Sequence, residues 1–95
     1  MFFITELFDP LGTNQAEVSE RLGTDKFCYF NSSPVQPESS LSCGYFCCYW
    51  IQVRLLNSDK PFQIVLNSYF TTNVFKNQAI IDEFIETGKI FDENV

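Results

Sequence analysis

The sequence predicts a small α+β fold, in which a central cysteine-bearing helix packs on a small sheet. Two short segments, Phe2–Phe8 and Lys26–Phe30, are rich in residues that favour strands. The stretch Cys43–Val53 is apolar and uncharged but too short to span a bilayer, so it suits a buried helix. Two later segments carry apolar residues at helical intervals. Ninety-five residues with 45% hydrophobic content suffice for one compact domain.

The amino-terminal part is expected to contain a strand, a turn, a helix and a second strand, in that order. Pro10 and Gly12 mark a turn directly after the first strand. The segment Asn14–Gly23 predicts a short surface helix, with the asparagine as its cap and the glycine at its end. After the second strand, Asn31–Ser42 is rich in serine and proline without periodicity, which indicates a loop.

The central helix is expected to run from Cys43 to about Leu56. Ser42 or Ser40 is placed to cap its start, and Asn57 begins a polar stop. Its aromatic residues are expected to pack in the core rather than to form a binding stripe. These residues are Tyr45, Phe46, Tyr49 and Trp50.

Two further helices are expected to pack on the central one. Pro61–Asn67 begins with a proline at a first-turn position, and Thr72–Thr87 has apolar residues at helical spacing. The prediction is therefore a single domain over residues 1–95. It divides into strands and loop (1–42), the cysteine-bearing helix (43–57) and the last helices (58–95).

The composition disfavours several classes of partner. The net charge of −6 repels phosphate backbones and acidic membranes, which argues against nucleic acid and membrane as partners. Met1–Phe3 is apolar but has no basic region, and two acidic residues soon follow, so no signal peptide is predicted. Three of the four cysteines fall on one predicted helix, where they do not form the cross-links of a disulfide scaffold. We expect an intracellular protein with free thiols.

The most informative segment is the loop from Gln36 to Ser42, which delivers Cys43 to the first turn of an apolar helix. Backbone N–H groups are unpaired at a helix start, and the macrodipole favours negative charge there. A thiolate and the oxyanion of a tetrahedral intermediate are both stabilised at such a position. Gly44 leaves room for a substrate carbonyl to approach. The pattern favours nucleophilic attack by a thiol.

Around this cysteine the sequence resembles the adenovirus-type cysteine proteases (adenain) and, more distantly, the proteases that process ubiquitin-like modifiers. Those enzymes have a glutamine seven residues before a Cys-Gly pair that opens the central helix, as Gln36 and Cys43 are arranged here. Their acidic catalytic residue ends a strand before a Pro-x-Gly turn, as Asp9 does here. The resemblance covers roughly residues 2–50.

The resemblance implies a cysteine-proteinase fold that cleaves polypeptides and uses no cofactor or metal. It implies Cys43 as the nucleophile, Gln36 as the side-chain donor to the oxyanion hole beside the Cys43 N–H, and Asp9 as the residue that orients a histidine. Oxyanion donors are worth about 3–4 kcal/mol, and the carboxylate fixes the tautomer of the imidazole. The resemblance implies a viral maturation protease or a transposon-borne relative, which would act in the cytoplasm or nucleus of a host cell or in the virion.

The chain departs from that family because it contains no histidine. The family carries its histidine upstream of the strand that ends at Asp9, so the resemblance implies that this chain is the carboxy-terminal portion of an incomplete fold. A helix terminus stabilises a negative group by only about 0.3–1 kcal/mol, which does not replace an imidazolium. Removal of the base costs a related triad on the order of 10⁶ in turnover. We expect little or no peptidase activity from the chain alone.

Several alternatives remain open. Cys47 and Cys48, which resemble further cysteines of the adenain branch, suit small packing residues. A zinc site is disfavoured, because cysteines on one helix without histidine offer no tetrahedral ligand set. Cys28 suits a buried structural thiol, although adenovirus proteases have a cysteine near such a place that links to an activating peptide. The chain is either part of an enzyme, with its histidine on a missing or second polypeptide, or a non-catalytic remnant that binds protein.

Overall fold

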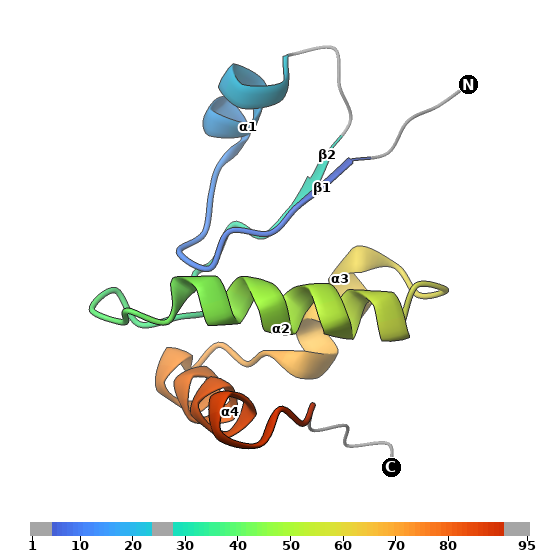
Figure 1. Cartoon of the computed structure of the whole chain (residues 1–95). Helices are drawn as coiled ribbons and strands as arrows, with labels where there is room; N and C mark the ends of the chain where they lie inside the picture. The colour runs from blue at the N-terminus through green and yellow to red at the C-terminus, as the bar shows by residue number, and fades with distance from the viewer. Residues whose placement is uncertain (1–4, 24–27, 91–95) are drawn as a thin grey trace.

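The computed structural model describes residues 5–23 and 28–90. Within these ranges the chain forms an α+β fold, as predicted. Its elements are β1 (Thr5–Leu7), α1 (Gln15–Leu22), β2 (Cys28–Phe30), α2 (Cys43–Leu56), α3 (Phe62–Tyr69) and α4 (Val74–Thr87). Figure 1 shows α2 as a middle layer, with the two strands on one side of it and α4 on the other.

The two strands form a parallel pair, in which Glu6 lies opposite Tyr29. Parallel strands need a crossover connection, and α1 lies between them in the chain. Both predicted strands are confirmed where the structure describes them. Residues 2–4 and 26–27 of the predicted strands lie outside the described residues, and Phe8 lies beyond the end of β1.

Both ends of α1 follow the predicted capping pattern. Oδ1 of Asn14 accepts a hydrogen bond from the N–H of Glu17 at 2.9 Å, which satisfies one of the free donors at the helix start. Gly23 ends the helix with a φ of 92°, and its N–H donates to the carbonyl oxygen of Ser19 at 2.8 Å. A positive φ of this kind favours glycine. The helix predicted for Asn14–Gly23 is therefore confirmed.

The predicted bounds of the central helix α2 are confirmed. Its buried residues are spaced by three or four positions and so lie on one face. They are Phe46, Tyr49, Trp50 and Val53. Tyr45 is 52% exposed, so the prediction that it packs in the core is wrong. Successive helical residues are rotated by about 100°, which turns Tyr45 out of the face to which Phe46 belongs.

The helices α3 and α4 both contact α2, as predicted, but their bounds differ slightly from the prediction. α3 runs to Tyr69 rather than Asn67, because the apolar face continues to the buried Phe70. α4 begins two residues later than predicted. Oδ1 of Asn73 accepts a hydrogen bond from the N–H of Phe75 at 3.1 Å, so Asn73 is the cap that sets the helix start.

Phe70, directly after α3, lies at the centre of the aromatic core. Its ring centroid is 5.8 Å from that of Phe8, 6.1 Å from Phe46, 5.7 Å from Tyr49 and 6.4 Å from Trp50. Phe8, which follows β1, also stacks on Trp50 with centroids 4.9 Å apart. These aromatic contacts join the strand layer to α2 and α3.

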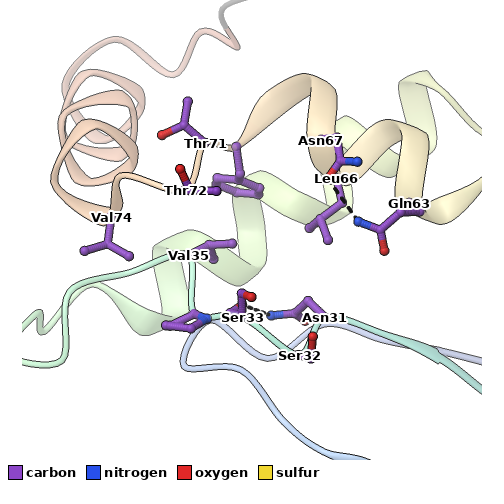
Figure 2. Close-up of a pocket in the computed structure, with 12 residues that line it drawn as sticks. Asn31, Ser32, Ser33, Val35, Gln63, Leu66, Asn67, Thr71, Thr72 and Val74 are labelled. Carbon is purple, nitrogen blue, oxygen red and sulfur yellow. Dashed lines mark hydrogen bonds between the residues drawn. The ribbon is translucent and has the colours of Figure 1, made fainter.

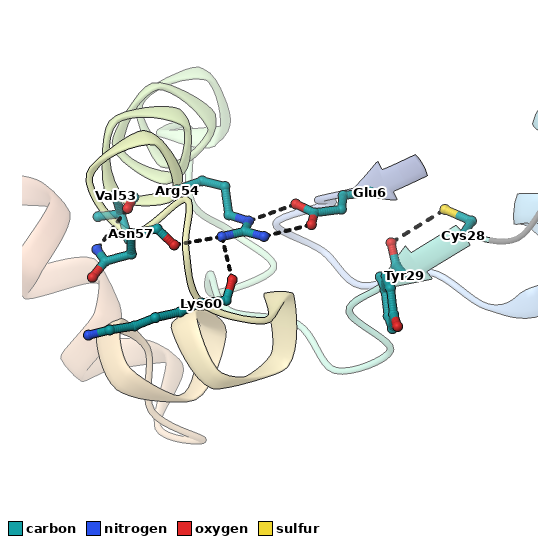
Figure 3. Close-up of polar contacts among 7 residues, drawn as sticks. All are labelled: Glu6, Cys28, Tyr29, Val53, Arg54, Asn57 and Lys60. Atoms are coloured by element: carbon teal, nitrogen blue, oxygen red, sulfur yellow. Dashed lines mark hydrogen bonds and ion pairs between the residues drawn. The ribbon is translucent and has the colours of Figure 1, made fainter. Parts of the chain in front are cut away.

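An ion pair also joins β1 to α2 (Figure 3). The Arg54 guanidinium donates to both carboxylate oxygens of Glu6 at 2.8 Å. The same guanidinium donates to the carbonyl oxygens of Asn57 and Lys60, each at 2.8 Å. Hydrogen bonding to Arg54 lowers the pKa of the Glu6 carboxyl below its ordinary value of 4.5. The two-pronged contact holds β1 against α2.

Replacing the carboxylate of this ion pair is expected to change the acid stability of the chain. Because the folded pKa of Glu6 is lowered, its contribution is present above pH 4.5 and is lost as the pH falls below that value. The side chains of Arg54 and Glu6 are 20% and 28% exposed, so solvent screening limits the contribution to about 1 kcal/mol. In urea unfolding, Glu6→Gln should lower the free energy of unfolding by that amount near pH 7 and by less near pH 3. An equal loss at both values would contradict this, and Glu20→Gln on the surface of α1 is the control.

Candidate functional site

Cys43 is the first residue of α2, and it is exposed. The first backbone hydrogen bond of the helix runs from the N–H of Phe46 to the carbonyl oxygen of Ser42 at 3.0 Å. Within the described part of the chain, no group accepts a hydrogen bond from the backbone N–H groups of residues 43–45. Three donors at this helix start therefore remain available to an anionic group.

The serine cap predicted for this helix start is absent. Ser42 occupies the capping position, but its hydroxyl accepts no hydrogen bond from the first turn, and its backbone (φ −94°, ψ 18°) is not extended. The hydroxyl oxygen of Ser40 accepts from the N–H of Ser42 instead, at 3.1 Å. The prediction that one of these serines caps the helix is wrong. The missing cap leaves open one further N–H group, that of Gly44 or Tyr45, which a serine at this position would otherwise occupy.

Asp9 lies in the turn that follows β1. Its Oδ1 accepts a hydrogen bond from the N–H of Leu11 at 3.0 Å, and the N–H of Gly12 donates to its carbonyl oxygen at 2.8 Å. Gly12 has a φ of 82°, and a Cβ there would lie 2.8 Å from the carbonyl oxygen of Ser32. Only glycine fits this position. The turn predicted at Pro10 and Gly12 is confirmed.

Asn31, which the sequence did not single out, holds Asp9 in place. The Asn31 side chain is buried; its Oδ1 accepts from the N–H of Asp9 at 2.9 Å, and its Nδ2 donates to the carbonyl oxygen of Asp9 at 2.6 Å. Nδ2 also donates to the carbonyl oxygen of Ser33 at 3.1 Å. One amide thus ties the turn to the loop that leads to Gln36. The one signal in the sequence is an asparagine directly after the second strand, where such side chains bond to turn backbone.

Gln36 is buried beside the same turn, with 3% of its surface exposed. Its backbone N–H donates to the carbonyl oxygen of Pro10 at 3.1 Å, and the N–H of Val35 donates to the same oxygen at 2.9 Å. Its side-chain Oε1 is buried and has no hydrogen-bond partner among the described residues. An unpaired buried polar atom costs about 1–3 kcal/mol, so it is unusual in a native fold. This atom is an acceptor, whereas an oxyanion would need the amide nitrogen as donor.

The structure brings Asp9 and Cys43 to the same end of α2. Burial raises the pKa of the Cys47 thiol, and the neighbouring Cys43 and the Asp9 carboxylate raise it further. Because Cys47 lies one turn after Cys43, the carboxylate is within electrostatic range of the first two turns of the helix. In the described ranges, no hydrogen bond joins the Gln36 side chain to Cys43 or Asp9. Gln36 is linked to the Asp9 turn through the backbone of Pro10.

All four cysteines carry free thiols, as predicted. Cys48 is exposed, so the prediction that it is a packing residue is wrong, whereas Cys47 is half-buried. Cys48 follows Cys47 on the helix and is rotated away from the buried face. Cys28 is half-buried rather than buried, and its Sγ donates to the carbonyl oxygen of Tyr29 at 3.3 Å. Burial raises the pKa of its thiol.

Residues 5–23 and 28–90 contain neither a candidate metal site nor a membrane-spanning helix. No group of three or more Cys, Asp or Glu side chains there could hold a metal ion. None of the helices described is long and apolar enough to cross a membrane.

A cavity of about 400 Å³ lies between the loop at residues 31–35, α3 and the α3–α4 connection. Figure 2 shows Asn31 and Ser33 of the loop on one side and Gln63 and Asn67 of α3 on the other. The lining carries amide, hydroxyl and apolar groups and no charged side chain. Cys43 does not line this cavity, so the exposed thiol lies outside it.

A second cavity, of about 410 Å³, lies between β1 and α2. Phe8, Cys47 and Trp50 contribute to its lining, with Ile51 and Leu55 farther along the helix. Its lining therefore includes Phe8, which directly precedes Asp9, and Cys47, which lies one turn after Cys43.

No protein-family model, curated protein or solved structure matches this chain. The arrangement of its own residues is therefore what a function must be argued from. That arrangement comprises an exposed thiol at an uncapped helix start, a carboxylate in electrostatic range of the same turns, and a buried amide with an unpaired oxygen.

Proposed function

We propose that this chain carries the nucleophile part of a cysteine-peptidase site with an adenain-like fold. Cys43 is the nucleophile, and the amide of Gln36 and the backbone N–H of Cys43 bind the oxyanion. Asp9 orients a histidine that the chain itself does not contain. The substrate is a polypeptide.

The observation that carries this proposal is the uncapped start of α2. A serine hydroxyl at the capping position normally occupies one first-turn N–H group. Here the N–H groups of residues 43–45 have no acceptor within the described ranges, and the thiol on the first of these residues is exposed. When a thiolate attacks a carbonyl, Sγ bonds to the carbon and negative charge moves to the oxygen, which such donors stabilise. A helix capped by its own serine would have fewer free donors.

Proton transfer at this site needs a histidine, which residues 1–95 do not contain. In a cysteine peptidase a base takes the thiol proton, and its protonated form later gives that proton to the leaving amine. In this proposal Asp9 would orient the imidazole; its support is that the Asp9 carboxylate acts electrostatically on Cys47, one turn after Cys43. Without the imidazole we expect no hydrolysis of amides. Reaction with an activated acyl group remains accessible: the thiol proton passes to water or buffer, Sγ bonds to the acyl carbon, and the leaving group departs as an anion that needs no proton.

Cys43 is expected to become acylated when the chain is incubated with an activated ester of a short peptide that ends in glycine. This reaction depends only on the nucleophile and the oxyanion donors. Mass spectrometry after digestion locates the acyl group. Acylation should be lost with Cys43→Ala and should fall on the order of 10²-fold with Gln36→Ala, which removes one oxyanion donor. Cys48→Ala, which removes another exposed thiol of the same helix, is the matched control and should leave acylation unchanged.

Three results would change the proposal. Equal acylation of Cys43 and Cys48 in the wild type would contradict it, because it predicts donors that favour one of two exposed thiols. Full acylation of a folded Gln36→Ala variant would remove Gln36 from the site. Clear turnover of the corresponding amide, abolished by Cys43→Ala, would show that the chain needs no added histidine.

A non-catalytic protein-binding domain is the second candidate, and the cavity between β1 and α2 favours it. The stacked rings of Phe8 and Trp50 line the cavity, and the neighbouring Ile51 and Leu55 are 57% and 71% exposed. Exposed apolar groups around a hollow are typical of a surface that binds protein. Selective acylation of Cys43 would decide against this candidate as the sole function.

A further inference from the structure

Gln78 of α4 is hydrogen-bonded to the loop directly before Cys43. Its Oε1 accepts from the hydroxyl of Ser40 at 2.5 Å, and its Nε2 donates to the hydroxyl oxygen of Ser42 at 3.2 Å. Nε2 also donates to Oδ1 of Asp82, one turn later on the same helix, at 2.9 Å. Both ends of the amide are therefore engaged, and its orientation is fixed.

These contacts account for the missing serine cap. The Ser40 hydroxyl donates to Gln78 while its oxygen accepts from the N–H of Ser42, which holds the loop in a tight turn. Ser42 has a ψ of 18° in this turn, whereas a capping residue is extended. Its hydroxyl faces Gln78 instead of the N–H groups of Gly44 and Tyr45, the two that a serine at this position would cap.

The adjacent residue Asn77 holds the other end of the same loop. Asn77 is fully buried, and its Nδ2 donates to the carbonyl oxygens of Val35 and Thr71 at 2.9 Å and 2.8 Å. Its Oδ1 accepts from the N–H of Thr71 at 2.8 Å. Two consecutive residues of α4 thus fix the loop on both sides, just before Gln36 and just before Cys43.

We infer that Gln78 is a positioning residue for the oxyanion site, which draws the Ser42 hydroxyl away from α2 and so keeps the first-turn N–H groups free. The catalytic meaning of this role rests on the proposed function. Gln78 acts through Ser42 and touches no reacting atom. Through Gln78, the helix α4 influences the chemistry at Cys43, although it contributes no residue to the predicted site.

The exchange of backbone amides with water, measured by NMR on the ¹⁵N-labelled 95-residue chain, tests this inference. In the wild type the N–H groups of Gly44 and Tyr45 should exchange without protection. In Gln78→Ala the freed Ser42 hydroxyl should cap the helix and slow the exchange of one of these two groups about fivefold, the effect of a typical serine cap. The double variant Gln78→Ala/Ser42→Ala should restore fast exchange.

Two single variants make the test independent of how Gln78→Ala folds. Ser42→Ala alone should leave the exchange of both amides unchanged, because this hydroxyl does not cap the wild-type helix. Gln63→Ala removes a glutamine of α3 that also bonds to a residue one turn later, Asn67, and should have no effect. About fivefold faster exchange in Ser42→Ala would overturn the inference, and so would unchanged exchange in a folded Gln78→Ala variant.

Acylation separates this inference from the proposed function. With the activated ester, Gln78→Ala should slow the acylation of Cys43 by up to about fivefold, because the Ser42 hydroxyl would then occupy the N–H of Gly44 or Tyr45, whose partial positive charge otherwise adds to that of the Cys43 N–H at the oxyanion. Alkylation by iodoacetamide, which forms no oxyanion, should keep its rate. If the exchange results are as expected but wild-type Cys43 is acylated no faster than Cys48, the role of Gln78 in the loop stands and the proposed function fails.

Discussion

Replacing Phe70 with alanine is expected to lower the free energy of unfolding by about 3–5 kcal/mol. The Phe70 ring contacts four other aromatic rings, which belong to the segment after β1 and to α2. Its removal deletes a buried side chain and leaves a cavity that rings so firmly packed fill only in part. A domain of this size is stable by roughly 5–15 kcal/mol, so the loss is a large share of the total. Urea unfolding followed by circular dichroism measures it.

Phe75→Ala is the matched control for this prediction. Phe75 is also a phenylalanine of the carboxy-terminal part, but it is 73% exposed at the start of α4. Its replacement should change the free energy of unfolding by no more than about 0.5 kcal/mol, as at other surface positions. Equal losses for the two variants would show that Phe70 is not the centre of the core.

Replacing Asn77 with aspartate is expected to lower the free energy of unfolding by about 3–5 kcal/mol near pH 7. The amide nitrogen of Asn77 donates to the carbonyl oxygens of Val35 and Thr71, and a carboxylate can donate to neither. The substitution places a negative charge beside two carbonyl oxygens at a fully buried position. It would also release the loop that carries Gln36.

The loss in Asn77→Asp should shrink in acid. Burial raises the pKa of the introduced carboxyl in the folded chain above its value in the unfolded chain. A group of this kind destabilises the fold only above its unfolded pKa, and the cost grows by about 1.4 kcal/mol per pH unit until the folded pKa is reached. The difference in unfolding free energy between variant and wild type should therefore be smaller near pH 4 than near pH 7.

Asn67→Asp is the control for the pH dependence, because Asn67 is an exposed asparagine of α3. Its effect should be small and nearly the same at both pH values. A loss in Asn77→Asp that does not depend on pH would mean that the buried charge is not its cause. The lost hydrogen bonds alone would then have to explain it.

The sequence predicted the helices well because their signals are local. The asparagine and glycine that bound α1 act within four residues of the positions they cap, and α2 combines an apolar face with a polar stop at Asn57. α3 begins one residue and ends two residues later than predicted, and α4 begins two residues later but ends where predicted. The apolar face of α3 continues to Phe70, and α4 starts after Asn73, which the prediction did not treat as a cap.

The candidate site was only partly accessible from the sequence. Asp9, Gln36 and Cys43 were chosen for their spacing and neighbours, which one chain segment displays. Asn31 and Gln78 were missed because their partners lie 22 and up to 38 residues away. No local pattern records such pairs, since they depend on how loop and helix meet in three dimensions.

Burial on α2 was predicted less well than its bounds. Tyr45 and Cys48 were expected in the core, and both are exposed. Apolar residues indicate that a helix can be buried. Whether a given residue is buried depends on its angular position around the helix axis. The helix is apolar on most of its circumference, so composition alone could not separate the packed face from the exposed one.

The separation of contacts along the chain implies an order of assembly. The helices α2 and α3 are close neighbours in sequence, and α4 follows them shortly. The bond of Glu6 to Arg54 instead closes a loop of 48 residues, longer than the 36 to 42 residues that separate Gln78 and Asn77 of α4 from their partners in the loop before α2. Longer loops cost more entropy to close, so we expect the helices to associate first and the strand layer to dock afterwards. The helix that carries Cys43 would then pack early in folding, and the Asp9 carboxylate would join it in the last step.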